Sequence, residues 1–176
     1  MKTTTTYSAL ALALVSTTLT SCQSPAPTSA TASPPSPTKQ DVAYCENATK
    51  SFLSSQYGSD VSVPVRYFTP EFARLWIWAC APGEDGMPFF NYEPILETQD
   101  DEPEMHRFGP GVIENDRIKV PVNYRFTFAG GRSFTKEFVF IKSGDKWHIE
   151  DIYTTGLEPG RRSEVAFLRK NQVTAQ

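Results

Sequence analysis

The sequence has few cysteines and histidines, no excess of positive charge and no long apolar run. It holds three cysteines and two histidines in 176 residues, and its formal net charge is −3. Because a mildly acidic chain does not attract phosphate backbones, we expect no nucleic-acid partner. A membrane-spanning helix needs about 20 consecutive apolar residues, and no such run is present. His106 and His148 lack the spacing of metal ligands, so we expect neither a metal site nor a cofactor.

Motifs of the common catalytic classes are missing as well. The sequence has no phosphate-binding loop, no Gly-x-Ser-x-Gly elbow and no cysteine–histidine nucleophile pattern. The acidic run at residues 100–104 lacks the alternation of a calcium loop and is typical of a solvated loop. We therefore expect a protein that is not an enzyme, and we keep an enzyme as the alternative.

The first part of the chain is nearly free of charge, since Lys2 is the only charged residue before Lys39. A short apolar region at residues 9–15 follows Lys2, which is the plan of a secretory signal. Residues 19–22, Leu-Thr-Ser-Cys, resemble the bacterial lipobox. That resemblance implies cleavage before Cys22 and lipid chains on the new terminus, each buried methylene adding about 0.8 kcal/mol to anchorage. The alternative is an ordinary secreted protein in which Cys22 is incidental.

The predicted address is the cell envelope, on the exported side of a membrane. Gln23, rather than aspartate, follows the cysteine. Resemblance to sorted bacterial lipoproteins then implies the periplasmic face of the outer membrane in a host with two membranes. Proline, serine, threonine and alanine dominate the next residues, a composition that favours an extended, semi-stiff tether. We therefore divide the chain into a signal peptide (1–21), a lipidated cysteine with its tether (22–39) and one domain (40–172).

The first half of the domain predicts two helices. Apolar residues spaced three and four apart indicate a helix over residues 41–57. A second helix is predicted to follow Thr69, a good N-cap before Pro70, and to end near residue 81. Residues 84–111, which hold four prolines, are predicted to be a loop with one short helical turn.

The second half changes to a period of two, which is typical of strands. Strands are predicted over residues 118–128, 134–141 and 146–154, with turns at 130–131 and 143–145. Pro121 predicts an edge or a bulge in the first strand. Ile149 and Ile152 differ in parity, which predicts a bulge near Glu150 and Asp151. A short terminal helix is expected over residues 164–170.

This order of elements is similar to the NTF2-like, cystatin-like α+β fold. Residues 41–170 also resemble the DUF3828 family of small bacterial exported proteins of unknown function. Three tracts carry the likeness: residues 91–95 with Gln99 and Asp100, residues 147–152, and residues 162–164 with Phe167 and Leu168. The chain departs from the family where Glu93 replaces its usual aspartate, and its terminal Ser-Leu-Arg pattern is kept only loosely. The resemblance implies an α+β NTF2-like cone, with two N-terminal helices on a curved antiparallel sheet of three to four strands.

Two cysteines remain once Cys22 carries lipid. Cys45 and Cys80 lie on the two predicted helices, and exported proteins meet oxidising surroundings. We expect a disulfide between them, which the chain-entropy model values at about 3–4 kcal/mol. The alternative is two buried free thiols.

A pocket on the concave face of the sheet is the remaining candidate site. Its polar residues would be Tyr124, Asp151, Tyr153 and Asp100, with Gln99 as a further candidate. In pocketed relatives of this fold, a carboxylate with a raised pKa performs acid–base work beside a tyrosine or histidine. The simpler interpretation is that Asp151 bonds the backbone at the bulge and that Tyr124 packs with its hydroxyl at the rim.

Three functions follow from these features. The first is a non-catalytic lipoprotein, held on the membrane by its N-terminal lipid, that binds an envelope protein or a small ligand. The second is an NTF2-like enzyme with an acid–base pocket. The third is an inhibitor or immunity-like protein of the envelope.

Overall fold

The computed structural model describes residues 36–56, 65–84, 86–90, 95, 105–126, 131–157 and 160–174. All of them belong to one compact unit, residues 35–176. Cys22, the signal peptide and most of the tether lie outside the described residues. So do Gln99 and Asp100. Within the described part of the chain, no helix is long and apolar enough to cross a membrane.

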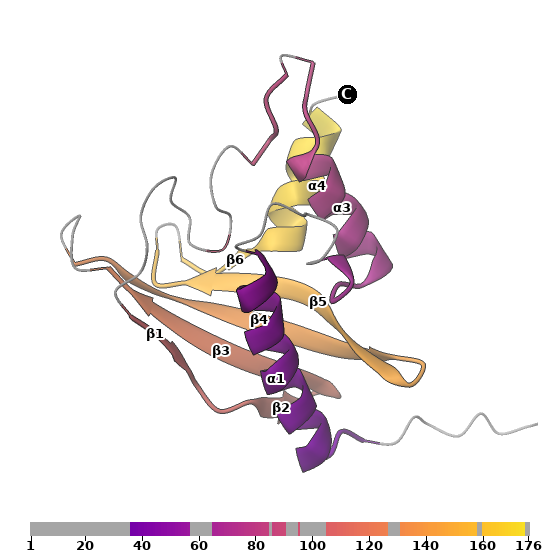
Figure 1. The fold of residues 1–176 in the computed structure, drawn as a ribbon, viewed down its shortest axis with the longest axis vertical. Helices are drawn as coiled ribbons and strands as arrows, with labels where there is room; N and C mark the ends of the chain where they lie inside the picture. Colours follow the sequence, from indigo (N-terminus) through magenta and orange to yellow (C-terminus); the bar gives the residue numbers. More distant parts are fainter. Residues whose placement is uncertain are drawn as a thin grey trace, which may run out of the picture. The chain divides into compact units, whose positions relative to one another are not determined.

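The domain is α+β, as predicted, and its strands form one antiparallel sheet (Figure 1). The described helices are α1 (Lys39–Gln56), α3 (Pro70–Cys80) and α4 (Glu164–Thr174). The strands are β1 (Met105–Phe108), β2 (Val112–Glu114), β3 (Arg117–Arg125), β4 (Ser133–Ser143), β5 (Lys146–Thr155) and β6 (Arg162–Ser163). Their order is β1-β3-β4-β5-β6, and β2 also pairs with β3. Six described strands replace the predicted three to four, because the short strands β1, β2 and β6 add to the three long ones.

The long strand β3 contains Pro121, where sequence predicted an edge or a bulge. β1 and β2 pair with the two ends of β3 on the same side, and residues 109–111 between them form no strand. The Pro121 carbonyl accepts a hydrogen bond from the Gly109 N–H at 2.8 Å. The nitrogen of a strand residue faces the same neighbour as its carbonyl, so the missing N–H of Pro121 faces this break. Pro121 thus lies at an interruption of the neighbouring strand, while β3 itself runs on.

The predicted bulge in β5 is confirmed. Val139 of β4 pairs with Asp151, whereas the next residue, Phe140, pairs with Ile149. Glu150 is therefore the extra residue, and it allows both Ile149 and Ile152 to be fully buried. After the bulge, Asp151 and Tyr153 lie on the face opposite the isoleucines.

Helix α1 lies across one face of the sheet (Figure 1), and aromatic side chains pack between the helix and this face. Phe52 is central, with ring centroids 5.3 Å from Phe68 and 5.7 Å from Phe138 of β4. The apolar face predicted for this helix is confirmed, since Cys45, Ala48, Thr49, Phe52 and Leu53 are all buried. This face of the sheet is thus filled largely with aromatic side chains.

Helices α3 and α4 lie side by side near the β5–β6 edge (Figure 1). The predicted N-cap of α3 is confirmed, because Thr69 accepts a hydrogen bond from Phe72 N–H. Glu71 bonds Arg169, and Arg74, one turn later, bonds Gln172, so the two helices run in the same direction. The predicted terminal helix exists as α4 and extends to Thr174.

The expected disulfide is not present: Cys45 and Cys80 are both free thiols. Phe52 of α1 contacts Phe68, which lies just before α3. Cys45 lies about two turns before Phe52 in α1, and Cys80 is the last residue of α3. Both cysteines therefore lie away from this contact, and a disulfide needs closely placed Cβ atoms. Burial raises the pKa of Cys45 to about 12 and that of Cys80 to about 11. Both therefore stay protonated and unreactive at neutral pH.

An ion-paired groove on the outer face of the sheet

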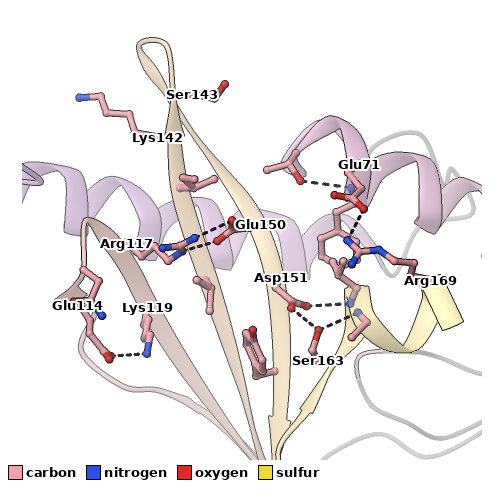
Figure 2. Close-up of a pocket in the computed structure, with 18 of the residues that line it drawn as sticks. Glu71, Glu114, Arg117, Lys119, Lys142, Ser143, Glu150, Asp151, Ser163 and Arg169 are labelled. Atoms are coloured by element: carbon pink, nitrogen blue, oxygen red, sulfur yellow. Dashed lines mark hydrogen bonds and ion pairs between the residues drawn. The ribbon is translucent and has the colours of Figure 1, made fainter. Parts of the chain in front are cut away.

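The face of the sheet away from α1, here called the outer face, carries a hollow (Figure 2). Strand alternation places residues 117 and 119 of β3, 139 and 141 of β4, and 151 and 153 of β5 on this face. The hollow has a volume of about 690 Å³. Val139, Ile141 and Tyr153 line it from the sheet, and the first turns of α3 and α4 line one side. The end of β2 contributes Glu114, and the β2–β3 turn contributes Asn115. We call this hollow the groove.

Opposite charges are paired across the groove. Arg117 of β3 reaches over β4 to Glu150 of β5 with two hydrogen bonds, at 2.6 and 3.2 Å. Three more pairs border it: Lys119 with Glu114 at 2.5 Å, Arg169 with Glu71 at 2.5 Å, and Arg161 with Glu137 at 2.6 Å. These pairs are partly exposed, so each contributes only about 0–1 kcal/mol to stability. Their main effect is to fix a pattern of alternating charge on the surface.

Asp151 lies in the wall of the groove as a helix cap. Its side chain is 8 % exposed and accepts hydrogen bonds from the Ser163 hydroxyl at 2.5 Å, Val165 N–H at 3.0 Å and its neighbour Ile152 N–H at 2.8 Å. Ser163 in turn accepts from Ala166 N–H at 3.0 Å, which is the bond of an N-cap. Both carboxylate oxygens are therefore committed to the start of α4, in agreement with the simpler interpretation of Asp151.

Tyr153 lies two residues further along β5, next to Arg161. The Arg161 guanidinium carbon is 3.8 Å from the centre of the tyrosine ring, a cation–π contact. Burial, followed by the nearby charge of Asp151, raises the pKa of the Tyr153 hydroxyl above its usual value. Tyr153 therefore stays neutral at ordinary pH and offers the groove an aromatic face and a hydroxyl.

The candidate residues named from sequence do not come together. Asp151 and Tyr153 line the groove, whereas Tyr124 has the opposite parity in β3 and is buried on the face that packs against α1. There it borders a small hollow of about 220 Å³, together with His106, Lys50 and other residues. Asp100 lies outside the described residues. No single site thus combines the predicted carboxylates and tyrosines.

Sequence reasoning missed the groove's ion pairs, although a signal was present. Lys119, Glu137 and Glu150 occupy outward positions of the predicted strands, and Arg117 directly precedes the first of them, so opposite charges on neighbouring strands were visible. What sequence could not supply was the register of β3, β4 and β5. Arg117 meets Glu150 because the register of the three strands places the two residues on either side of β4, and the bulge adds Asp151 beside Glu150 on the outer face.

A second polar cluster, on the face that packs against α1, was also missed. Lys136 is fully buried, and its ammonium donates to the Thr154 hydroxyl at 2.7 Å. Glu164, 1 % exposed, pairs with Arg162 at 3.4 Å. The signal was a lysine at an inward position between Phe134 and Phe138. Because Lys136 and Glu164 are buried, we interpret the cluster as structural.

The described residues include no group of three or more His, Cys, Asp or Glu side chains arranged to hold a metal ion. Fold and site together define an α+β domain whose sheet buries one face under helices and presents a charged groove on the other. Comparison with known proteins finds no matching family model, no similar curated protein and no similar solved structure.

Proposed function

We propose that this protein is a lipid-anchored envelope protein that binds a protein partner or a small ligand without transforming it. The observation that carries the proposal is the groove, a hollow of about 690 Å³ whose apolar strand residues are bordered by fixed charges. Apolar surface within a charged border is the usual anatomy of a binding face. The lipobox at Cys22 and the tether supply the proposed address.

The state of Asp151 argues against the enzyme alternative. A general acid or base must have a hydrogen-bonding position open to substrate. Asp151 instead bonds two backbone N–H groups and the Ser163 hydroxyl, and all three belong to the bulge or the start of α4. Its chemistry is that of a cap, and the groove is left to recognise shape and charge.

The fold proposed with this function is the NTF2-like cone of the DUF3828-like proteins. Its support is the order of elements, two helices before an antiparallel meander, together with the tracts at residues 147–152 and 162–164. The curvature of the sheet and the closure of the cone stay predictions.

Affinity capture of the full chain from native membranes tests the groove. The variant Arg161→Glu with Arg169→Glu reverses two charges that line it. We expect a partner recovered in stoichiometric amount with the unaltered protein to be lost with this variant. Arg74→Glu is the matched control, because Arg74 is exposed on α3 and does not line the groove. Equal recovery with all three proteins would refute binding through the groove. A captured toxin or hydrolase whose activity falls on binding would identify the inhibitor-like alternative.

A further inference from the structure

A second hollow, of about 390 Å³, lies on the outer face at the other end of the strands. It forms where β3 ends, β4 begins and β5 ends, and no residue lining it also lines the groove. Its polar lining comes from Arg107, Asn123, Arg125, Ser133, Thr135 and Thr155. None of its nine lining residues is acidic, although the protein as a whole has a net charge of −3.

The two arginines of this hollow differ from those of the groove. Arg117, Arg161 and Arg169 are each paired with a glutamate. Among the described residues, neither Arg107 nor Arg125 has a hydrogen-bond or ion-pair partner, and both are exposed. Their charges are therefore uncompensated within the part of the chain that the structure describes.

Strand register brings the two arginines close together. Arg107 of β1 is directly opposite Asn123 of β3, and Arg125 follows two residues later on the same strand and face. Such diagonal neighbours are about 7–8 Å apart, a distance that two long side chains can close on a common ligand. Without a ligand, two like charges at this separation repel each other, so an anion between them would relieve that repulsion.

Neighbouring side chains present donors to the same place. The Thr135 hydroxyl donates to the Asn123 Oδ1 atom at 2.7 Å, which occupies the acceptor of this amide. The two N–H donors of the Asn123 amide are then available beside the guanidinium groups. Thr155 is paired with Thr135 on the next strand and adds a hydroxyl to the lining. Donors thus outnumber acceptors, which is the arrangement an oxyanion requires.

We infer that Arg107 and Arg125, assisted by Asn123, form a binding site for a phosphoryl group. A phosphate monoester carries about −1.5 to −2 charges at neutral pH and three strong acceptor oxygens. Two guanidinium forks match that charge and bind such oxygens through paired hydrogen bonds. A soluble phosphorylated molecule and an anionic lipid headgroup share this chemistry.

Binding to defined probes tests the site. We would use the full chain with Cys22→Ala, so that no lipid of its own contributes to vesicle binding. Calorimetry would measure binding of inorganic phosphate and pyrophosphate. Co-sedimentation would compare phosphatidylcholine vesicles with and without phosphatidic acid. Saturable binding of the soluble anions alone identifies a free phosphoryl ligand, and selective binding of the vesicles with phosphatidic acid identifies a headgroup. Either result supports the site.

Variants locate the binding. Arg107→Gln and Arg125→Gln should each weaken binding by about tenfold or more, because each removes charge-assisted hydrogen bonds. Arg107→Lys should weaken it less, since it keeps the charge and loses only the fork. Arg74→Gln is the matched control: it removes an exposed positive charge that lines neither hollow. All four side-chain changes are at exposed positions, so thermal unfolding should stay unchanged and serves as the folding check. No saturable binding to any probe, or equal loss with Arg74→Gln, would overturn the inference.

Discussion

At the residue scale, Asp151 joins the last long strand to the last helix. It accepts from Val165 N–H and the Ser163 hydroxyl, and Ser163 caps the first turn of α4. Residues 151 and 163 are twelve positions apart in sequence, so this joint exists only in the folded state. Its energetic role can be separated from any catalytic one by measuring stability.

We predict that Asp151→Ala lowers the free energy of unfolding by about 1–3 kcal/mol, because it leaves a nearly buried N–H donor and a hydroxyl without their acceptor. Ser163→Ala should cost about 1 kcal/mol as a lost N-cap. The double variant should cost less than the sum, since the two residues share one hydrogen bond. Urea denaturation of the four proteins provides the values. An unchanged free energy of unfolding in Asp151→Ala would show that the cap does not stabilise the fold, and would reopen the acid–base alternative.

Asp41 has a comparable role where the tether enters the domain. Its carboxylate accepts from the Thr38 hydroxyl at 2.6 Å and the Thr38 N–H at 2.8 Å, which caps α1. It also accepts from the Trp147 indole N–H at 2.8 Å, which ties the helix to β5. These bonds, that of the Thr38 hydroxyl first, lower the pKa of Asp41 from 3.8 to about 2.

The depressed pKa of Asp41 predicts an acid-dependent loss of stability. Its ionised form is favoured in the folded state, so its contribution is fully present above about pH 4 and is lost as the pH falls through 2. Asp41→Asn should unfold at a lower urea concentration at neutral pH and lose less further stability between pH 4 and 2. Asp145→Asn, an exposed change in the β4–β5 turn, is the control. The idea fails if Asp41→Asn keeps the acid sensitivity of the unaltered protein.

At the scale of elements, the bulge in β5 determines which side chains reach each face. With Glu150 inserted, Ile149 and Ile152 both lie in the core while Glu150 and Asp151 line the groove. Because side chains alternate strictly along a strand, loss of this one residue would turn half of β5 over.

Deletion of Glu150 should therefore be far more damaging than its substitution. The deletion forces one isoleucine out of the core, at a cost of about 2–5 kcal/mol. Glu150→Ala keeps the bulge and removes only a partly exposed ion pair with Arg117, for about 0–1 kcal/mol. Urea unfolding followed by circular dichroism distinguishes the two. Similar midpoints for deletion and substitution would contradict the account of the bulge.

At the scale of the whole molecule, the proposed anchor at Cys22 is separated in sequence from the described domain. The domain begins as described at residue 36, and α1 is capped by Thr38 and Asp41. Because the described part of the domain begins 14 residues after Cys22, we expect the lipid and the fold to be independent.

We predict that Cys22→Ala releases the protein from membranes into the soluble fraction and leaves its thermal unfolding unchanged. The substitution removes the thiol that the lipobox resemblance marks for lipid. Fractionation followed by immunoblotting measures the release. Ser21→Ala is the control, because alanine is also small and should preserve the lipobox. Membrane association that persists in Cys22→Ala would refute lipidation.

Much of this architecture could be predicted from local patterns, because periodicity depends on neighbours in sequence. The start of α1, the Thr69 cap of α3, the three long strands and the bulge near Glu150 all follow from such patterns. Strand β1 did not, because four residues are too few to show a period. The Arg117–Glu150 pair depends on the register of three strands. The Asp151–Ser163 hydrogen bond depends on the chain folding back after β5. Local patterns contain neither kind of information. The expected disulfide failed for the same reason, since two cysteines on neighbouring helices need not face each other.

The interruption opposite Pro121 affects how copies of the protein can meet at this sheet edge. The sheet edge there consists of two short strands separated at residues 109–111, with Pro110 in the break and the Gly111 N–H held by Glu46 of α1. A long continuous edge would offer a template to which another chain could add a strand. The proposed lipid anchor would concentrate copies in a plane, where such additions would be most frequent. An edge that is interrupted and bonded to α1 therefore disfavours the addition of a strand from a neighbouring copy.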